Sequence, residues 1–108
     1  MRDSYIAEMP LLRFILSTGA TRAQIKALLA KLSRNQLNFI SEIAFNILKG
    51  VIPLTENDKE TLRHFVRQIR SIGQKKRRCT HIRKVLTVNG LLAILKVSLH
   101  HIEGLIEK

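Results

Sequence analysis

The stretch SRNQLNFISEIAFNILKG, residues 33–50, predicts the central element of the fold. Ser33 precedes Gln36 by three residues, a spacing at which a side-chain oxygen accepts hydrogen bonds from free amides of the first helical turn. Apolar residues then recur every three or four positions and form one side of a helix: Leu37, Ile40, Ala44 and Ile47, with Ile43 and Leu48 beside them. The other side holds the polar residues Asn38, Glu42, Asn46 and Lys49. Gly50 ends the pattern, because glycine adopts the left-handed conformation at little cost. An amphipathic helix with one buried face is therefore expected.

Two signals place helices before this stretch. Thr21 precedes Gln24 by three residues, which repeats the capping-box spacing and starts another helix. Pro10 suits the first turn of a helix, where its missing amide is no loss. We therefore expect an earlier helix over residues 9–18, closed by Gly19.

After the first stretch, a short connector and a long helix are expected. Pro53 disfavours helical backbone at the residue before it. Thr55 then caps a helix, and Glu56 and Asp58 complement its positive N-terminal end. Without a further break in the pattern, this helix should continue to Gly73.

Two more helices are expected towards the C-terminus. Thr80 is positioned to cap a short helix over residues 81–88, which Asn89 and Gly90 would stop. The final segment, residues 91–107, reads as an amphipathic helix. Its apolar face is expected to hold Leu91, Ile94, Leu95, Leu99, Ile102 and Ile106.

These elements define an all-α class, a compact bundle of five or six short helices that forms a single domain over residues 1–108. Aromatic residues make up 5% of the chain and Trp is absent, so Leu, Ile, Val and Ala must fill the core. The single cysteine, Cys79, excludes an internal disulfide. The N-terminal region does not resemble a signal peptide, and no window is apolar enough to cross a membrane, so we expect a protein that is neither secreted nor membrane-spanning.

Charge is concentrated in one quarter of the sequence. The formal net charge is +11, yet residues 59–84 hold ten cations and one acid, whereas residues 85–108 hold two of each. A small domain tolerates such a local excess best when its partner is a polyanion. The basic segment, residues 59–84, is therefore the candidate functional region.

Within the basic segment, cations four, four and three residues apart share one face of the expected long helix and lead into the run KKRR. This arrangement predicts a continuous positive strip that binds DNA phosphates. The expected nucleic-acid-binding residues are Lys59, Arg63, Arg67, Arg70, Lys75, Lys76, Arg77, Arg78, Arg83 and Lys84. Phe65 is the one Phe, Tyr or Trp in the segment and belongs to the apolar arc, so base stacking is not expected. The run KKRR also fits a nuclear localisation signal.

Other kinds of chemistry have little support in the sequence. No Cys or His pair has zinc-ligand spacing, and no glycine-rich loop fits a phosphate group. Most carboxylates lie at expected helix starts or in the terminal segments. We therefore expect no catalytic residues, no metal and no cofactor.

Residues 28–96 resemble a family of small basic proteins encoded by Maverick or Polinton-type elements and adintoviruses. The shared marks are a helix ending in ISEIAFNILKG (residues 40–50), then IPLT (residues 52–55), a Lys- and Arg-rich stretch and a hydrophobic end. Members of this family have been compared with the precursor of adenovirus core protein X, or mu, which packs with viral DNA in the capsid. The resemblance implies a core protein that condenses double-stranded DNA in the host nucleus or the virion.

A helical interaction module is the alternative hypothesis. In this interpretation the basic strip binds an acidic protein partner, and residues 91–107 form a homo-oligomer through their apolar face. The same helix, assisted by the strip, would also suit contact with an anionic membrane.

Overall fold

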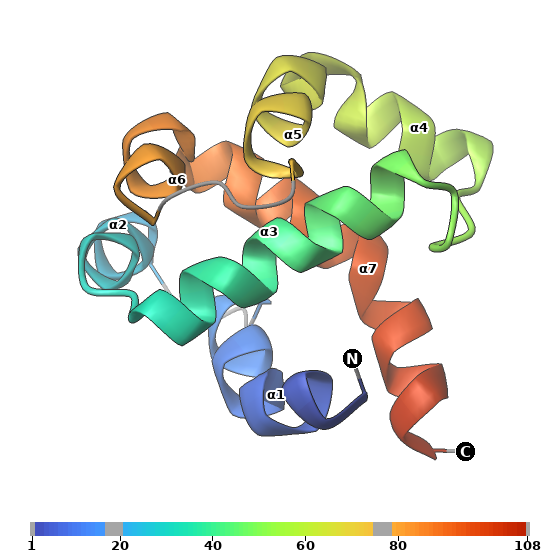
Figure 1. Cartoon of the computed structure of the whole chain (residues 1–108), viewed down its shortest axis with the longest axis horizontal. Helices are drawn as coiled ribbons and strands as arrows, with labels where there is room; N and C mark the ends of the chain where they lie inside the picture. The colour runs from blue at the N-terminus through green and yellow to red at the C-terminus, as the bar shows by residue number, and fades with distance from the viewer. Residues whose placement is uncertain (1, 17–20, 75–78, 108) are drawn as a thin grey trace.

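A computed structural model of the chain describes the backbone of residues 2–16, 21–74 and 79–107 and the side chains of residues 7–16, 21–74, 79–99 and 101. Within these ranges the chain is helical apart from short connectors and contains no strand, which confirms the all-α class (Figure 1). The Cα radius of gyration is 12.8 Å. A folded domain of this size is expected at ~13 Å, so the helices pack at ordinary density.

The helix predicted after Ser33 is α3 (Arg34–Leu48), which crosses the middle of Figure 1. Its capping box is complete, since Ser33 Oγ accepts a hydrogen bond from the Gln36 amide at 3.1 Å and Gln36 Oε1 accepts one from the Ser33 amide at 2.8 Å. Gly50 follows with φ of 76°, as predicted. The expected polar face is wrong at Asn46, which is 3% exposed. Its buried side chain leaves no polar atom without a hydrogen bond, because no buried side-chain N or O atom of the described residues lacks a partner.

The last helix, α7 (Val88–Glu107), lies behind α3 in Figure 1 and packs along α1 (Arg2–Leu16). Leu91 and Ile94 are 0% exposed. Most other side chains from position 91 to 98 are also buried, so this part of α7 is covered on more than one side. Self-association through the buried side chains of residues 91–98 would therefore require them to leave the core. The side chains of residues 102–107 lie outside the described set.

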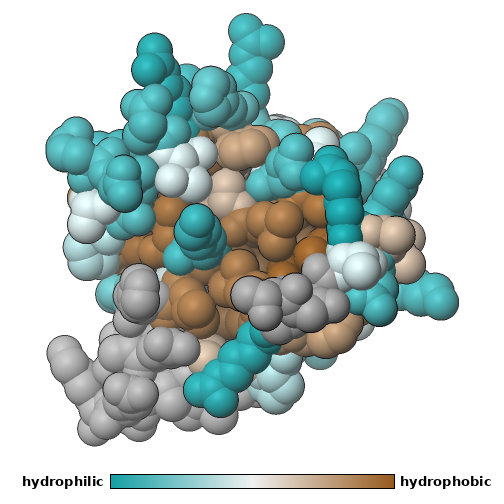
Figure 2. Space-filling view, turned by 180° about the vertical axis from the view of Figure 1, so that it is seen from behind, coloured by the Kyte–Doolittle hydropathy of each residue, from teal (hydrophilic) through white to brown (hydrophobic). Residues whose placement is uncertain are grey.

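The face opposite Figure 1 is apolar at its centre (Figure 2). Hydrophilic residues gather along the upper edge and the sides of this view. Leu92 and Leu99 of α7 and Leu11 of α1 are half-buried and pack against the buried core.

The N-terminal helices are partly as predicted. Thr21 caps α2 (Arg22–Ala30) through a complete capping box with Gln24. The predicted start of the first helix is wrong, because α1 begins at Arg2 and contains Pro10 in its interior. Pro10 has no amide hydrogen to donate to the carbonyl four residues before it, so α1 lacks one internal hydrogen bond. The predicted end of that helix falls at residues 17–20, outside the described residues.

The long helix predicted between Thr55 and Gly73 is divided. Thr55 caps α4 (Glu56–Leu62), which is followed by a 3-10 turn, η1 (Arg63–Phe65), and by α5 (Val66–Ile72). The main partners of the two helices differ, since α4 packs against α7, whereas α5 packs mostly against α3 and α6 and to a smaller extent against α7. The backbone changes direction at η1 (Figure 1).

The C-terminal helix boundaries also differ from the prediction. The short helix α6 (Cys79–Val85) begins one residue before Thr80, and Asn89 and Gly90 lie in the first turn of α7 instead of ending α6. The cap of α7 is Thr87, whose Oγ1 accepts a hydrogen bond from the Gly90 amide at 3.0 Å.

The cap of α7 is completed from another helix. Gln68 of α5 accepts a hydrogen bond from the Thr87 amide at 3.1 Å, the role that a Glu or Gln three residues after the cap usually fills. Gly90 holds that position here, and a Cβ atom on it would overlap the Gln68 side chain. The glycine therefore leaves the space that Gln68 occupies.

Candidate nucleic-acid interface

Among the exposed charged side chains of the described residues, basic ones outnumber acidic ones. Every Lys and Arg side chain that the structure describes is exposed. The sequence contains no acid between Glu60 and Glu103, which leaves α5 and α6 without a carboxylate of their own. The positive charge of these two helices is therefore uncompensated within the helices themselves.

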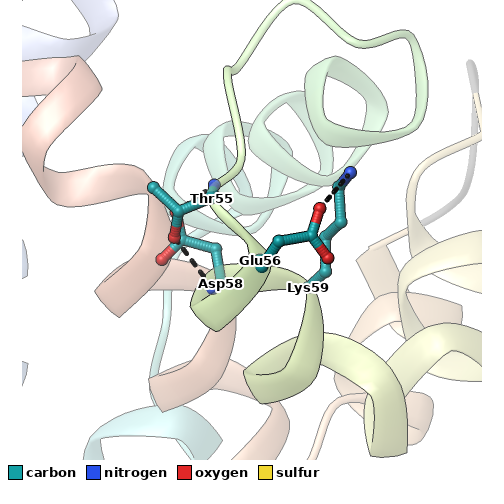
Figure 3. A network of polar contacts seen from close by, with 4 residues as sticks. All are labelled: Thr55, Glu56, Asp58 and Lys59. Carbon is teal, nitrogen blue, oxygen red and sulfur yellow. Dashed lines mark hydrogen bonds and ion pairs between the residues drawn. The ribbon is translucent and has the colours of Figure 1, made fainter.

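The two cations at the start of the predicted strip are partly compensated. Lys59 Nζ lies 3.4 Å from Glu56, and an Arg63 nitrogen lies 3.6 Å from Glu60, in exposed pairs one helical turn long. Figure 3 shows the first pair beside the α4 cap, where Asp58 bonds to Thr55 instead of to a cation. Exposed pairs of this kind contribute little and are screened by salt, so Lys59 and Arg63 remain able to contact a phosphate.

Arg67 and Arg70 are the cations of α5, and both are exposed. Neither has a hydrogen bond or ion pair within the described part of the chain. They share one helical stripe with Ser71, since positions three and four residues apart lie on the same side of a helix. Because η1 separates α5 from α4, this pair does not continue the straight row that a single helix would have given.

Ser71 connects the cations of α5 to α6. Its hydroxyl oxygen lies 2.7 Å from His81 Nε2 in a half-buried hydrogen bond. Lys84, three residues after His81, is exposed on α6. The contact thus brings the stripe of Arg67 and Arg70 beside α6, and we call these two residues and Lys84 the α5–α6 basic surface.

Arg83 has a structural role that the sequence did not indicate. Its guanidinium donates hydrogen bonds to the carbonyls of Ala30 and Leu32, each at 2.6 Å, and a longer one to Leu29 at 3.5 Å. The carbonyls of Leu29 and Ala30 belong to the last turn of α2, and that of Leu32 lies two residues beyond it. A cation at this end also offsets the negative end of the helix dipole. The exposed Arg83 side chain, which was expected to bind DNA, is thus bonded to backbone carbonyls of the protein itself.

The predicted residues Lys75, Lys76, Arg77 and Arg78 lie outside the described residues, but both flanks of this run are placed. Gly73 is buried against α3, and a Cβ atom there would lie 2.9 Å from Leu48 Cδ1 and 3.0 Å from the Ala44 carbonyl carbon. On the other flank, Cys79 Sγ lies 3.6 Å from Asn38 Oδ1. The four cations therefore connect two points that both contact α3.

Carboxylates gather at a pocket between α1 and α3. A cavity of about 280 Å³ is lined by Ala7, Glu8, Asn35, Asn38, Phe39 and Glu42. It adjoins the start of α6, because Cys79 contacts Asn38. Within the described residues no three His, Cys, Asp or Glu side chains are grouped to hold a metal ion.

Comparison of the chain with known protein families, with curated proteins and with solved structures finds no match. The resemblance to proteins of Maverick or Polinton-type elements and adintoviruses therefore stays a prediction. No described helix is both long and apolar enough to cross a membrane.

Proposed function

We propose that the protein binds the phosphate backbone of double-stranded DNA through the α5–α6 basic surface. The observation that supports this most strongly is the exposure of Arg67, Arg70 and Lys84 on two adjoining helices that carry no acid. In the proposed complex, Lys59 and Arg63 extend the contact at one end, and Lys75, Lys76, Arg77 and Arg78 contribute further phosphate contacts. Arg83 belongs to the fold and not to the contact.

The proposed binding does not depend on base sequence. Proteins that stack on bases present exposed aromatic rings among their cations. Here Phe65 is half-buried in the apolar cluster, and His81 is bonded to Ser71. Contacts from flexible cations to phosphates position a protein on DNA without reading its sequence.

The biological role proposed is DNA condensation by a core protein of a virus-like element, in the nucleus or in particles. This part of the proposal rests on the resemblance of residues 28–96 and on the charge of the whole chain. A net charge of +11 on 108 residues offsets a large share of the phosphate charge that one molecule covers. Duplex DNA carries one negative charge per ~1.7 Å of its axis, so DNA duplexes pack closely only when this charge is neutralised.

Salt-dependent binding to duplex DNA tests the proposal. Each phosphate contact contributes about 0.9 to the slope of log affinity against log salt. The double variant Arg67→Gln with Arg70→Gln should therefore lower that slope by about 1.8 and weaken binding to all sequences equally. The measurement is fluorescence anisotropy of two unrelated duplexes at four or more salt concentrations.

A matched control variant distinguishes the effect of this surface on DNA binding from the effect of net charge. The variant Arg13→Gln with Lys96→Gln removes the same two charges from exposed positions of α1 and α7. It should change the slope by less than half as much. Equal losses in both variants would contradict an interface at α5 and α6. Retention of a purified acidic protein or of anionic vesicles, with no affinity for DNA, would favour the interaction module instead.

Changing Lys75, Lys76, Arg77 and Arg78 to Glu tests the contribution of the basic run. The proposal expects loss of DNA binding at physiological salt, because four attractive contacts become repulsive. Affinity equal to that of the unchanged protein would exclude this run from the interface.

A further inference from the structure

Three hydroxyl side chains lie next to cations between the start of α5 and the start of α7. They are Ser71 of α5, Thr80 of α6 and Thr87 before α7. Each is preceded by Arg or Lys within four positions, the setting in which a kinase with an acidic substrate cleft binds its target. The structure distinguishes the three by what their hydroxyls contact.

Two of these hydroxyls are already used by the fold. Ser71 is half-buried and bonded to His81 at 2.7 Å. Thr87 Oγ1 accepts a hydrogen bond from the Gly90 amide and lies 3.2 Å from Gln68 Oε1. A kinase would have to break the α5–α6 contact or the cap of α7 to reach either of them.

Thr80 is different. It is exposed in the first turn of α6, and its hydroxyl has no hydrogen-bond partner within the described residues. In sequence it follows KKRRC, so that Arg77 and Arg78 precede it by three and two residues. Guanidinium groups at these positions pair well with carboxylates in the substrate cleft of a kinase.

We propose that Thr80 is a phosphorylation site for a basophilic serine/threonine kinase, and that the phosphate weakens DNA binding. In this reaction Thr80 Oγ1 bonds to the γ-phosphorus of ATP while the bond to the β-phosphate oxygen breaks. ADP leaves, and the hydroxyl proton passes to the catalytic carboxylate of the kinase. The second half of the inference rests on the DNA-binding function proposed above.

The physical effect of the phosphate follows from its charge and place. Phosphothreonine carries about −1.5 to −2 charges near neutral pH. Lys84 lies four residues after Thr80, one turn along the same helix, so the phosphate would pair with it and compete with DNA. Loss of one or two phosphate contacts lowers the salt slope by about 0.9 to 1.8.

Kinase treatment of the full chain tests the site itself. The probe is the purified catalytic subunit of cAMP-dependent protein kinase with ATP, and mass spectrometry locates the phosphate. We expect one phosphate, on Thr80, which Thr80→Val abolishes and Thr80→Ser retains. Arg77→Gln with Arg78→Gln should also prevent the reaction. Phosphate on Ser71 or Thr87, or no phosphate under conditions that modify a control peptide, would overturn the assignment.

DNA binding by the phosphorylated protein tests the effect. Affinity at physiological salt should fall about tenfold, in line with the loss of one or two contacts. Thr80→Glu should move in the same direction, and Thr80→Gln serves as its uncharged control. If unmodified protein does not bind DNA, the proposed function fails while the kinase site stands. If Thr80 carries phosphate and affinity is unchanged, the regulatory half fails.

Discussion

The helices α7 and α5 differ in the burial and charge of their side chains. In α7, the side chains from Leu91 to Val97 are mostly buried, and Lys96 is its exposed cation in that stretch. In α5, two isoleucines reach the core while Arg67 and Arg70 face solvent. The middle of α7 thus contributes mainly apolar burial, whereas α5 has a buried side and a positively charged side. The stability of the fold and the proposed binding should therefore respond to different substitutions.

The largest expected effect on stability is at the centre of α7. Ile94 is 0% exposed, and Ile94→Ala should lower the free energy of unfolding by about 2–5 kcal/mol, because burial is lost and a cavity remains. Urea denaturation followed by circular dichroism measures this change. Lys96→Ala, on the exposed side of the same helix, is the control and should stay within about 0.5 kcal/mol. Similar losses in both variants would contradict the central place of α7.

The close contact between α5 and α3 gives the next effect. A Cβ atom on Gly73 would lie 2.9 Å from Leu48 Cδ1 and 3.0 Å from the backbone carbonyl carbon of Ala44, both in α3, so Gly73→Ala forces these atoms to move. We expect a loss of about 1–3 kcal/mol. Gly50→Asn is a suitable comparison, since Asn tolerates a positive φ and a Cβ at Gly50 has open space around it. Denaturation midpoints of the two variants should differ clearly, and equal midpoints would argue against the tight crossing.

Two adjacent cations on α6 should behave oppositely. Arg83→Gln removes the hydrogen bonds to the end of α2 and should cost about 1–2 kcal/mol of stability, with little change in the salt slope of DNA binding. Lys84→Gln should leave stability within about 0.5 kcal/mol and lower that slope by about 0.9. Both variants change net charge equally. A larger loss of DNA binding in Arg83→Gln than in Lys84→Gln would indicate that Arg83 belongs to the interface.

The smallest effect on stability belongs to the basic surface itself. Arg67→Gln with Arg70→Gln should change the free energy of unfolding by less than about 0.5 kcal/mol, even though DNA binding weakens. Removing two like charges from an acid-free surface even favours slight stabilisation at low salt. Thermal unfolding at two salt concentrations checks this. A loss above 1 kcal/mol would mean that these side chains support the fold.

Local signals explain what the sequence predicted correctly. The capping boxes at Thr21 and Ser33 and the left-handed Gly50 depend on residues close in sequence, so spacing alone identifies them. The all-α class follows from the same caps and from the apolar periodicity. Exposure of Arg67 and Arg70 was also expected, because the helical pattern places the cations in a stripe beside the apolar arc.

The features that were missed depend on distant partners. Arg83 bonds to carbonyls more than fifty residues earlier, and nothing near it in sequence marks that role. The division of α4 from α5 accompanies different main partners, α7 for α4 and α3 with α6 for α5. Pro10 indicated a helix start by local preference, but α1 begins at Arg2 and holds Pro10 in its interior, and it packs along α7.

The cap that Gln68 supplies to α7 has a consequence for communication within the molecule. The amide of Thr87, at the start of the core helix, is bonded to a side chain from the helix that carries Arg67 and Arg70. DNA that binds to α5 and immobilises it would thus also keep this hydrogen bond formed. Hydrogen–deuterium exchange at Thr87 should then slow in the presence of DNA, so that the start of α7 reports an event at the α5–α6 basic surface through thermodynamic linkage.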